Sequence, residues 1–575
     1  MGEKTRIELS DWQLNAGILG LCNILNYAGD KFHIKDNYIE FEMEVLENFD
    51  SKYFNYLIHS YEGITHWDRL HKFYNKFSIH SEEQFESFNA DDLDTLNKMI
   101  RELKDYLKRP NYKKVYELVG LDINIEDEEK NLKQIKLSNK KSIVEVKDKI
   151  EEQFRVIEKI YKYVYSDNGK KYLFAKTLIY NIINQSWEGV SFLNRNTKEE
   201  DIYVDYKKTF VDKTIEYLKE DKSNFKLSCF ATGLPIKNKS TAYDMGFLVD
   251  TGFDTNRKTS HIWNFENDIY ICDLARLIYS CIPCGMIFTT GEDGIFINSN
   301  QSVEELIETN KNVKESIENS LKEGQTNRNL YIYKALVESI QKELTTRIYY
   351  ELSDIQVIRK EGGKYIFNIL SKEMIRTIRN SKELLNGIIP AGYKEGKNYY
   401  NLYPMTIERI LSGVNLFNLI HKLLINKLTK SASITNYFNS YHIHCLNKIN
   451  VNFLEGVNTL NNDKEKNKMI NQFNKSGWAL GEEYKNLKNK EKVKGIAYRL
   501  LNSLKTRNAE SFIHNLIHSY MYVGRQIPKD LIEVLGDEDK LGIIGYAFVT
   551  GLVASALSEE DDKVKLENSN KEENK

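Results

Sequence analysis

The chain has 575 residues, of which 41% are hydrophobic, 29% are charged and only 6 are proline. This composition excludes an intrinsically disordered chain and favours a folded, helix-rich protein with about two to four domains of roughly 150 residues each. The 81 basic and 83 acidic residues give a net charge of −2, which excludes a basic excess over the whole chain. Any nucleic-acid-binding surface must therefore be local.

The six cysteines are scattered through the chain, and its first residues contain no apolar signal-peptide core. Disulfide frameworks are typical of oxidising compartments and of short secreted chains. We therefore expect free thiols and a cytoplasmic location.

The first 400 residues mix helical and strand patterns. Residues 12–27 have the periodicity of a helix. Residues 32–45 alternate between apolar and polar side chains around a turn at 36–37, which predicts a half-buried hairpin. A second hairpin is predicted over 355–370, with its turn at 361–363.

Two long charged stretches, 124–165 and 303–352, also have helical periodicity. They could form an arm that reaches a partner, but a charged helix more often presents one face to solvent. We expect solvated helices that cover the sheet.

Strand patterns stop at about Tyr403, so the main boundary is predicted in the loop 392–404. The sequence predicts an α+β, predominantly helical protein. Its parts are a mixed α/β region over 1–400 with a degenerate zinc-finger-like insert, an antiparallel helical bundle over 401–558, and a disordered acidic tail over 559–575.

The segment 541–558 contains no charged residue, and its length is the lower limit for crossing a bilayer. Acidic residues flank it on both sides, with little basic anchoring. One interpretation is a membrane-tethered helical protein. The interpretation that we favour is a buried helix of the bundle, where an apolar surface all round is also expected.

Residues 229–288 contain two segments that resemble zinc knuckles in which the second cysteine is replaced. A four-cysteine zinc site uses two C-x2-C turns, but Cys229 is followed three positions later by Thr232, and Cys272 by Ala275. Two thiolates do not fill a tetrahedral zinc shell. Further ligands could come from nearby residues, namely Cys281, Cys284 and His261. We expect no cofactor, with zinc as the alternative.

The cysteines of 271–285, ICDLARLIYSCIPCG, also have an interpretation without metal. Cys281 and Cys284 could be a redox pair, but no thioredoxin-like pattern surrounds them. Helical spacing of Leu274, Leu277 and Cys281 favours plain packing. The chain contains no Walker loop and no HExxH pair, so we expect no enzyme; a metal-dependent nuclease with dispersed residues is the enzymatic alternative.

Three sequence blocks have a recognisable order and spacing. The first is DWQLNAGILGL at 11–21, and the second is the knuckle pair, with WNF at 263–265 and LIYSCIPCG at 277–285. The third lies within 499–552 and includes RLLNSLKTRNAESFIHNLIHSYMYVGRQIP and IGYAFVTGL. Together they resemble the large subunit of type I-B (formerly grouped with I-A) CRISPR Cascade complexes. The lost knuckle cysteines depart from that family's pattern.

The resemblance implies a non-enzymatic subunit of a crRNA-guided surveillance complex in antiviral defence. Such a subunit recognises the motif that flanks the target, stabilises the R-loop and recruits the effector. The implied partners are crRNA, target double-stranded DNA, the backbone, small and crRNA-processing subunits, and the helicase-nuclease, with no membrane. The resemblance also implies a small-subunit-like part from about residue 469, with Met469 as a candidate internal start.

A local basic run supports nucleic-acid binding. Residues 464–507 hold twelve Lys or Arg against four Glu. Four of the basic residues have the spacing of one helix face, namely Lys485, Lys488, Lys492 and Arg499. The basic run could contact successive phosphate groups along a nucleic-acid strand, or it could simply be a solvated helix face. The candidate phosphate-binding residues are Lys485, Lys488, Lys492, Lys494, Arg499, Lys505 and Arg507.

The loop 254–260, DTNRKTS, is one candidate for reading the flanking motif. Direct readout of bases uses side chains such as Arg and Lys at base edges. The candidate residues in this loop are Arg257 and Lys258.

Overall fold

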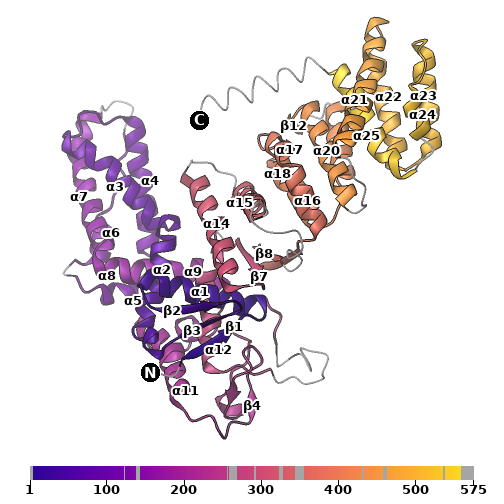
Figure 1. Cartoon of the computed structure of the whole chain (residues 1–575). Coiled ribbons are helices and arrows are strands. Elements are labelled where there is room, and N and C mark those ends of the chain that lie inside the picture. Colours follow the sequence, from indigo (N-terminus) through magenta and orange to yellow (C-terminus); the bar gives the residue numbers. More distant parts are fainter. Residues whose placement is uncertain are drawn as a thin grey trace. The chain divides into compact units, whose positions relative to one another are not determined.

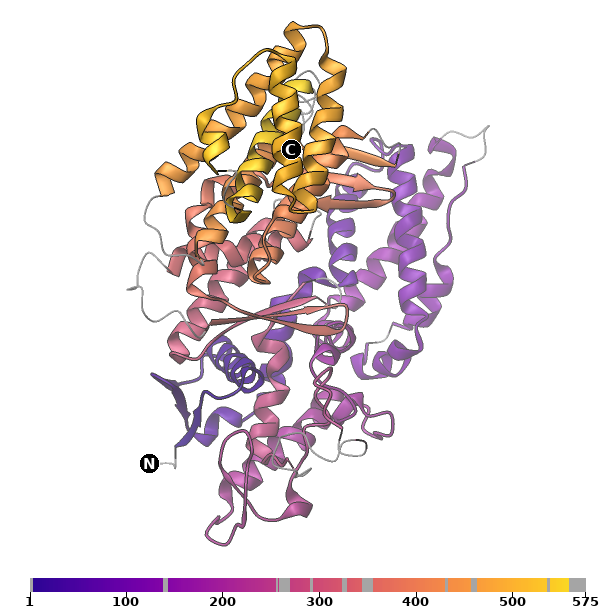
Figure 2. The same ribbon diagram turned by 90° about the vertical axis from the view of Figure 1, so that its right-hand side faces the viewer.

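The computed structural model describes residues 4–121, 123–137, 143–254, 257, 269–289, 293–322, 328–343, 355–429, 433–456, 463–534 and 538–557. Within these ranges the protein is predominantly helical with small antiparallel sheets, as the predicted α+β class requires (Figure 1; Figure 2 turns the view by 90°). The acidic tail 559–575, Lys258 and His261 lie outside the described residues.

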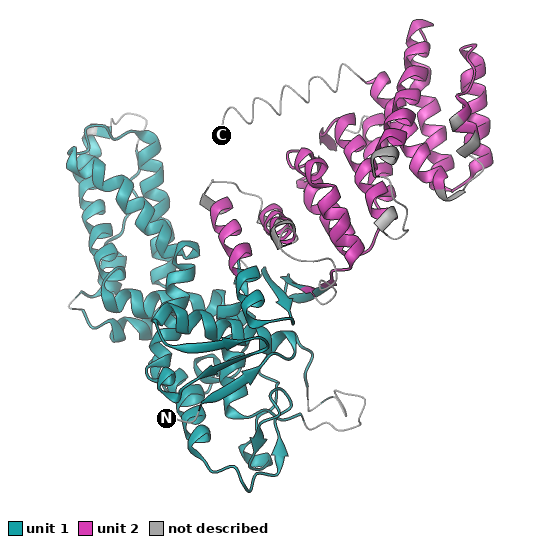
Figure 3. Ribbon diagram, in the orientation of Figure 1, with its two compact units in different colours: residues 1–310, 357–367 teal, residues 311–356, 368–575 magenta. Residues whose placement is uncertain are grey.

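The chain forms two compact units (Figure 3). Unit 1 comprises residues 1–310 and 357–367, and unit 2 comprises 311–356 and 368–575.

Unit 1 begins with a three-stranded antiparallel sheet of order β1-β3-β2. Its strands are β1 (Thr5–Glu8), β2 (Phe32–Lys35) and β3 (Tyr38–Phe41). In the central strand Ile39 pairs with Ile7 on one side and Ile34 on the other. The predicted hairpin is therefore confirmed up to Phe41. The prediction of strand up to residue 45 is wrong, because Met43–Leu46 turns into a short 3-10 helix that leads to α2 (Phe49–Tyr61).

Helix α1 (Trp12–Ala28) runs through the core of unit 1 and confirms the helix predicted over 12–27. Asp11 caps it, accepting hydrogen bonds from the N–H groups of Gln13 at 2.9 Å and Leu14 at 3.1 Å. Gly29, at φ 75°, ends it in the left-handed conformation that favours glycine. Its residues are buried from Gln13 to Cys22, around the whole helix, and only its last turn is exposed.

Some of the remaining helices of unit 1 pack on α1, and others pack on one another. Helices α12 (Asp273–Ser280) and α13 (Ile282–Gly285) pack directly on α1. The others are α3 (His66–Glu82), α4 (Ala90–Leu107), α5 (Pro110–Val119), α6 (Ile125–Asn131), α7 (Lys147–Val164), α8 (Asp167–Gly169), α9 (Ala175–Asn181), α10 (Ile202–Tyr206) and α11 (Asp212–Lys219).

The charged stretch 124–165 forms α6 and α7, which pack mainly against α3 and α4. The expectation that this stretch covers the sheet is wrong, because the apolar faces of these helices are buried against one another. The other charged stretch begins with α14 (Val303–Lys322), which does lie against a strand. The side chain of Asn310 accepts a hydrogen bond from Ile297 N at 3.0 Å and donates one to Ile297 O at 2.8 Å.

A four-stranded sheet has the order β6-β7-β8-β9. Its strands are β6 (Ile287–Phe288), β7 (Gly294–Ser299), β8 (Ile355–Glu361) and β9 (Lys364–Ile369). The last two confirm the hairpin predicted over 355–370. Its turn uses Gly362 and Gly363, both at positive φ (53° and 73°).

Unit 2 contains a second three-stranded sheet, of order β11-β10-β12, drawn as coral to orange arrows in Figure 2. Its strands are β10 (Gly392–Glu395), β11 (Asn398–Asn401) and β12 (Ile434–Tyr437). The prediction that strands stop at about Tyr403 is wrong, because β12 pairs with β10. The boundary predicted in 392–404 thus runs through this sheet.

Helix α25 (Glu538–Ala556) lies at the centre of the C-terminal helices of unit 2 and packs on α19, α20, α21 and α22. Glycines let α21 and α25 approach closely: a Cβ on Gly551 would lie 1.8 Å from Asn474 O, and one on Gly477 would lie 1.9 Å from Phe548 O. The other helices are α15 (Arg328–Glu343), α16 (Lys372–Asn380), α17 (Lys382–Gly387), α18 (Leu402–Leu411), α19 (Phe417–Leu428), α20 (Ser440–Gly456), α21 (Asp463–Asn486), α22 (Lys490–Lys505), α23 (Ala509–Tyr522) and α24 (Lys529–Val534).

The uncharged segment 541–558 lies mostly in α25, and the side chains described over 541–557 are mostly buried. This confirms a buried helix of the bundle. A search of the described residues finds no helix with both the length and the apolar character needed to cross a membrane.

Candidate functional site

The first degenerate knuckle is a tight turn between β4 (Leu227–Ser228) and β5 (Pro235–Ile236). Cys229 N donates to Leu234 O at 2.7 Å, and Gly233 N donates back to Cys229 O at 2.8 Å. Gly233 has φ 69°, the left-handed conformation that the turn requires. This turn holds the Cys229 side chain inward, where it is 2% exposed.

The second knuckle brings Cys272 onto the first. Cys272 stands at the N-cap of α12, and its N–H donates to Cys229 Sγ at 3.4 Å. Thr232 Oγ1 lies 3.8 Å from Cys272 Sγ. A hydrogen bond from Cys272 lowers the pKa of the Cys229 thiol, and the same bond with burial raises the pKa of Cys272 well above its usual range. Two thiols and a hydroxyl therefore occupy the place of a zinc site.

The two other candidate cysteine ligands lie elsewhere. Cys281 follows the far end of α12, nine residues after Cys272, which is about 13 Å along a helix. Burial raises its pKa to about 12, and its Sγ faces Leu277 O at 3.4 Å. Cys284 is also buried, within α13. The expectation that these two could complete the metal site is wrong, because zinc–sulfur bonds are only about 2.3 Å long. The complete burial of Cys281 agrees with the packing that its helical spacing predicts.

The knuckle residues do not fit a structural zinc ion. Among the residues that the structure describes, no group of three or more His, Cys, Asp or Glu side chains is placed to hold a metal. Thr232 offers a hydroxyl where a second thiolate would be needed, and Ala275 offers no donor.

The knuckle region packs directly on α1, so the first two sequence blocks are in contact in the folded chain. A Cβ on Gly17 would lie 2.3 Å from Ile278 O, and one on Gly20 would lie 2.0 Å from Cys281 O. Tyr279 OH donates to Asp11 Oδ2 at 3.0 Å, while the other oxygen of Asp11 caps α1. The signature glycines therefore serve close backbone packing.

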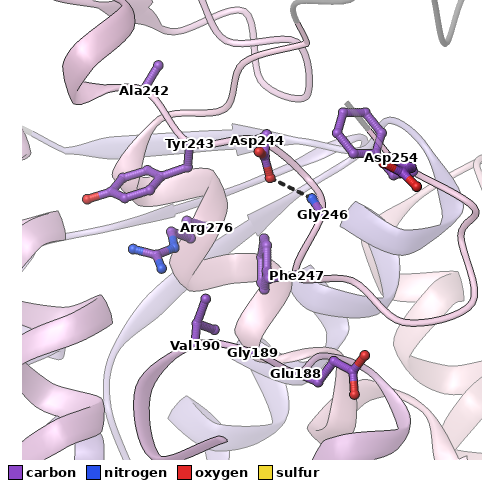
Figure 4. Close-up of a pocket in the computed structure, with 11 residues that line it drawn as sticks. Glu188, Gly189, Val190, Ala242, Tyr243, Asp244, Gly246, Phe247, Asp254 and Arg276 are labelled. Atoms are coloured by element: carbon purple, nitrogen blue, oxygen red, sulfur yellow. Dashed lines mark hydrogen bonds between the residues drawn. The ribbon is translucent and has the colours of Figure 1, made fainter. Parts of the chain in front are cut away.

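A cavity of about 610 Å³ adjoins the knuckles (Figure 4). Its base holds Arg276, whose guanidinium lies 4.0 Å from the ring centre of Tyr243 and 5.9 Å from that of Phe247. Burial lowers the pKa of Arg276, and its Nε is buried without a hydrogen-bond partner. The wall also carries three carboxylates, those of Glu188, Asp244 and Asp254. These donors, acceptors and rings suit a planar group with polar edges.

The basic segment of unit 2, defined as Lys485, Lys488, Lys492, Lys494, Arg499, Lys505 and Arg507, spans two helices. The prediction that Lys485, Lys488, Lys492 and Arg499 share one helix face is wrong. Helix α21 ends at Asn486, Lys488 has φ 56° in the turn, and α22 begins at Lys490.

Two rows of cations remain on α22. Lys492 and Arg499, seven residues apart, share one face, and Lys494 and Lys505, eleven apart, share another. All of the segment is exposed except Lys485 and Lys494, which are half-buried. Lys485 Nζ lies 2.8 Å from Glu482 Oε1, which neutralises part of its charge.

Exposed aromatic rings lie among these cations and were not predicted. Lys492 Nζ donates to Tyr522 OH at 2.8 Å and lies 4.3 Å from the centre of its ring. Tyr522 stacks on Tyr484 with centroids 5.3 Å apart. Trp478 is 41% and Tyr498 47% exposed. Interleaved rings and cations are typical of surfaces that bind single-stranded nucleic acid. In the sequence, only the density of Tyr and Trp near the basic run hinted at them.

The candidate motif-reading loop is only partly described. Arg257 is exposed, with its Nε 3.6 Å from Asp254 Oδ2, and Lys258 lies outside the described residues. Arg257 belongs to unit 1 and the basic segment to unit 2, so they are two separate candidate surfaces.

Comparison with known proteins gives one family. Residues 224–287 match the family described as CRISPR-associated protein (Cas_CXXC_CXXC), the segment that holds both knuckles and much of the cavity wall. No curated protein and no solved structure matches the chain. The match indicates a CRISPR-associated protein, with a role in CRISPR defence.

Proposed function

We propose that this chain is the large subunit of a type I-B Cascade surveillance complex, in the cytoplasm. It recognises the motif that flanks the target, stabilises the R-loop and recruits the helicase-nuclease, without chemistry of its own. Its partners are crRNA, target double-stranded DNA and the other Cascade subunits. In such complexes base pairing reads most of the target, and protein reads only the short flanking motif.

The main support for this proposal is the match of 224–287 to a CRISPR-associated family. This segment contains both degenerate knuckles, and the helix that follows the second knuckle packs on α1. The basic segment with Tyr522 and Trp478 adds a surface suited to a displaced single strand. The cavity at Arg276 adds a place for a base edge, since guanidinium groups donate to guanine O6 and N7.

The test is reconstitution of the complex with and without this chain. Binding of a labelled duplex that carries the flanking motif should tighten at least tenfold when the chain is present, and permanganate should detect unpaired thymines in the displaced strand. A duplex with a scrambled flanking motif is the control. Equal binding and equal strand opening without the chain would rule the proposal out.

A further inference from the structure

A second, smaller cavity in unit 1 is lined by residues of α3, α5 and α9 and by Arg109, which precedes α5. Its volume is about 100 Å³, and it is lined by His66, Arg109, Tyr112, Thr177, Tyr180 and Asn181. Helix α3 begins at His66, and α5 begins directly after Arg109. Helix N-termini carry partial positive charge, so both helix starts favour an anion here.

Two residues that line this cavity, His66 and Arg109, lie against the ring of Tyr106. The His66 ring lies 3.8 Å from the Tyr106 ring at an interplanar angle of 18°. The Arg109 guanidinium lies 4.6 Å from the centre of the same ring. Nε2 of His66 is buried without a hydrogen-bond partner, and a neutral imidazole can carry its proton on this atom.

Of the described residues that line the cavity, Arg109 carries a positive charge and none carries a negative charge, while Lys176 lies beside the lining residue Tyr180. Arg69 lies 3.4 Å from Glu102, and Lys114 lies 2.9 Å from Glu200, so these two charges are compensated. Arg109 and Lys176 form no ion pair with any residue in the described part of unit 1. Lys176 is half-buried beside Tyr180, with Nζ 5.5 Å from its ring centre.

The titration of these groups agrees with a surplus of positive charge. Burial, followed by Arg109 and Arg69, lowers the pKa of His66 to about 3. Burial and Lys114 lower the pKa of Lys176. A bound anion would reverse both electrostatic contributions.

We propose that this cavity binds a phosphate group, with Arg109 and Lys176 as its charge partners and His66 Nε2–H as a donor. The phosphate belongs either to a nucleic-acid backbone or to a free phosphate ligand. The proposal stands on the cavity alone and does not depend on the Cascade role.

The test uses the full chain and two probes. The first is a labelled single-stranded DNA 15-mer, titrated at several KCl concentrations. The second is inorganic phosphate, read by the rise in melting temperature over a KCl reference of equal ionic strength. The variant is Arg109→Gln with Lys176→Gln, and the matched control is Lys130→Gln with Lys213→Gln. The control removes two exposed lysines that pair with Asp127 and Glu216.

If the ligand is a nucleic-acid backbone, the cavity variant should bind DNA roughly 3- to 10-fold more weakly than the control. Its salt slope should fall by about 0.7 per lost phosphate contact. If the ligand is a free phosphate, DNA binding stays equal, but the variant loses a phosphate-induced rise of roughly 2 to 4 °C that the control keeps. Because phosphate also stabilises proteins non-specifically, only the difference between variant and control counts.

His66→Phe separates binding from structure, because it keeps the ring on Tyr106 and removes Nε2. This variant should weaken binding of the same probe, with little change of its melting temperature in KCl. Equal DNA affinity, salt slope and phosphate response in the cavity variant and the control would overturn the proposal.

Discussion

The knuckle region of unit 1 and the basic segment of unit 2 differ most in exposure to solvent. Cys229 and Cys272 are 2% and 1% exposed, fixed by backbone N–H groups and by packing on α1. The cations of α22 are mostly exposed. The difference shows that backbone hydrogen bonds and packing fix the shape of the first region, whereas the second depends on charge that solvent and salt can screen.

The largest effect is expected from Gly20→Val, in the contact that fastens the knuckle region. A Cβ there would lie 2.0 Å from Cys281 O, a backbone atom that cannot move alone. We expect a loss of about 3 kcal/mol, or roughly 6 to 12 °C in melting temperature. Differential scanning fluorimetry measures it.

The matched control is Gly495→Ala on α22, where nothing lies within 4 Å of the added Cβ. It should leave the chain as stable or raise stability by up to about 1 kcal/mol. Equal melting temperatures for Gly20→Val and the wild type would contradict backbone contact between α1 and α12.

The next effect comes from restoring the lost cysteines with Thr232→Cys and Ala275→Cys. Because both knuckle turns are in place, four sulfurs should then bind one zinc ion, raising the melting temperature by about 5 °C. Mass spectrometry of the metal content and fluorimetry with and without a chelator measure the gain.

The single variant Thr232→Cys serves as the control and should bind zinc much more weakly. The wild type should keep its melting temperature when the chelator is added. A chelator-induced fall in the wild type would show that ligands outside the described residues complete a zinc site.

A smaller effect is expected from neutralising the basic segment with Lys488→Gln, Lys492→Gln and Arg499→Gln. Loss of about two phosphate contacts should weaken single-stranded DNA binding roughly tenfold at low salt, or about 1.4 kcal/mol. Fluorescence anisotropy over a KCl series gives both affinity and slope. The same number of exchanges at the ion-paired Lys72, Lys130 and Lys213 is the control, and an equal loss there would mean that net charge alone is responsible.

The smallest effect is expected from thiol reagents. Burial raises the pKa of both Cys22 and Cys281 to about 12, so between pH 7 and 9 these thiols stay protonated as well as inaccessible. Iodoacetamide should leave both unmodified in the folded chain and label them only after denaturation, as peptide mass spectrometry would show. Labelling of Cys281 in the folded chain would contradict the packing described for α12.

The sequence predicted correctly those helices and strands whose formation depends on residues within the same segment. Helix α1, the 355–370 hairpin and the buried helix over 541–558 were predicted because apolar periodicity and glycine positions lie within each segment. The end of β3 and the strand β12 were missed. Four residues of β12, ITNY, form a strand because β10 is their partner, and no pattern in a helical region indicates that.

The candidate sites depend on residues that are distant in the chain. The break at Lys488 has neither Gly nor Pro to mark it, so α21 and α22 were predicted as one helix face. Tyr522 reaches Lys492 across thirty residues, and His66, Arg109 and Tyr180 line one cavity from three separate parts of the chain. The proximity of Cys229 and Cys272 was predicted correctly because the spacing of a knuckle pair implies which cysteines face each other.

The burial of α25 has a consequence for any separate C-terminal product. One that starts at Met469 would keep most of α21 and all of α22 to α25 but would lack α19 and α20. Tyr546 would lose the ring of Phe417, 5.4 Å away, and Thr550 would lose the Asn447 amide at 2.9 Å. In such a fragment, an aromatic ring and an amide of another chain would have to replace these two contacts. The structure shows the positions on α25 that the replacement groups would have to reach.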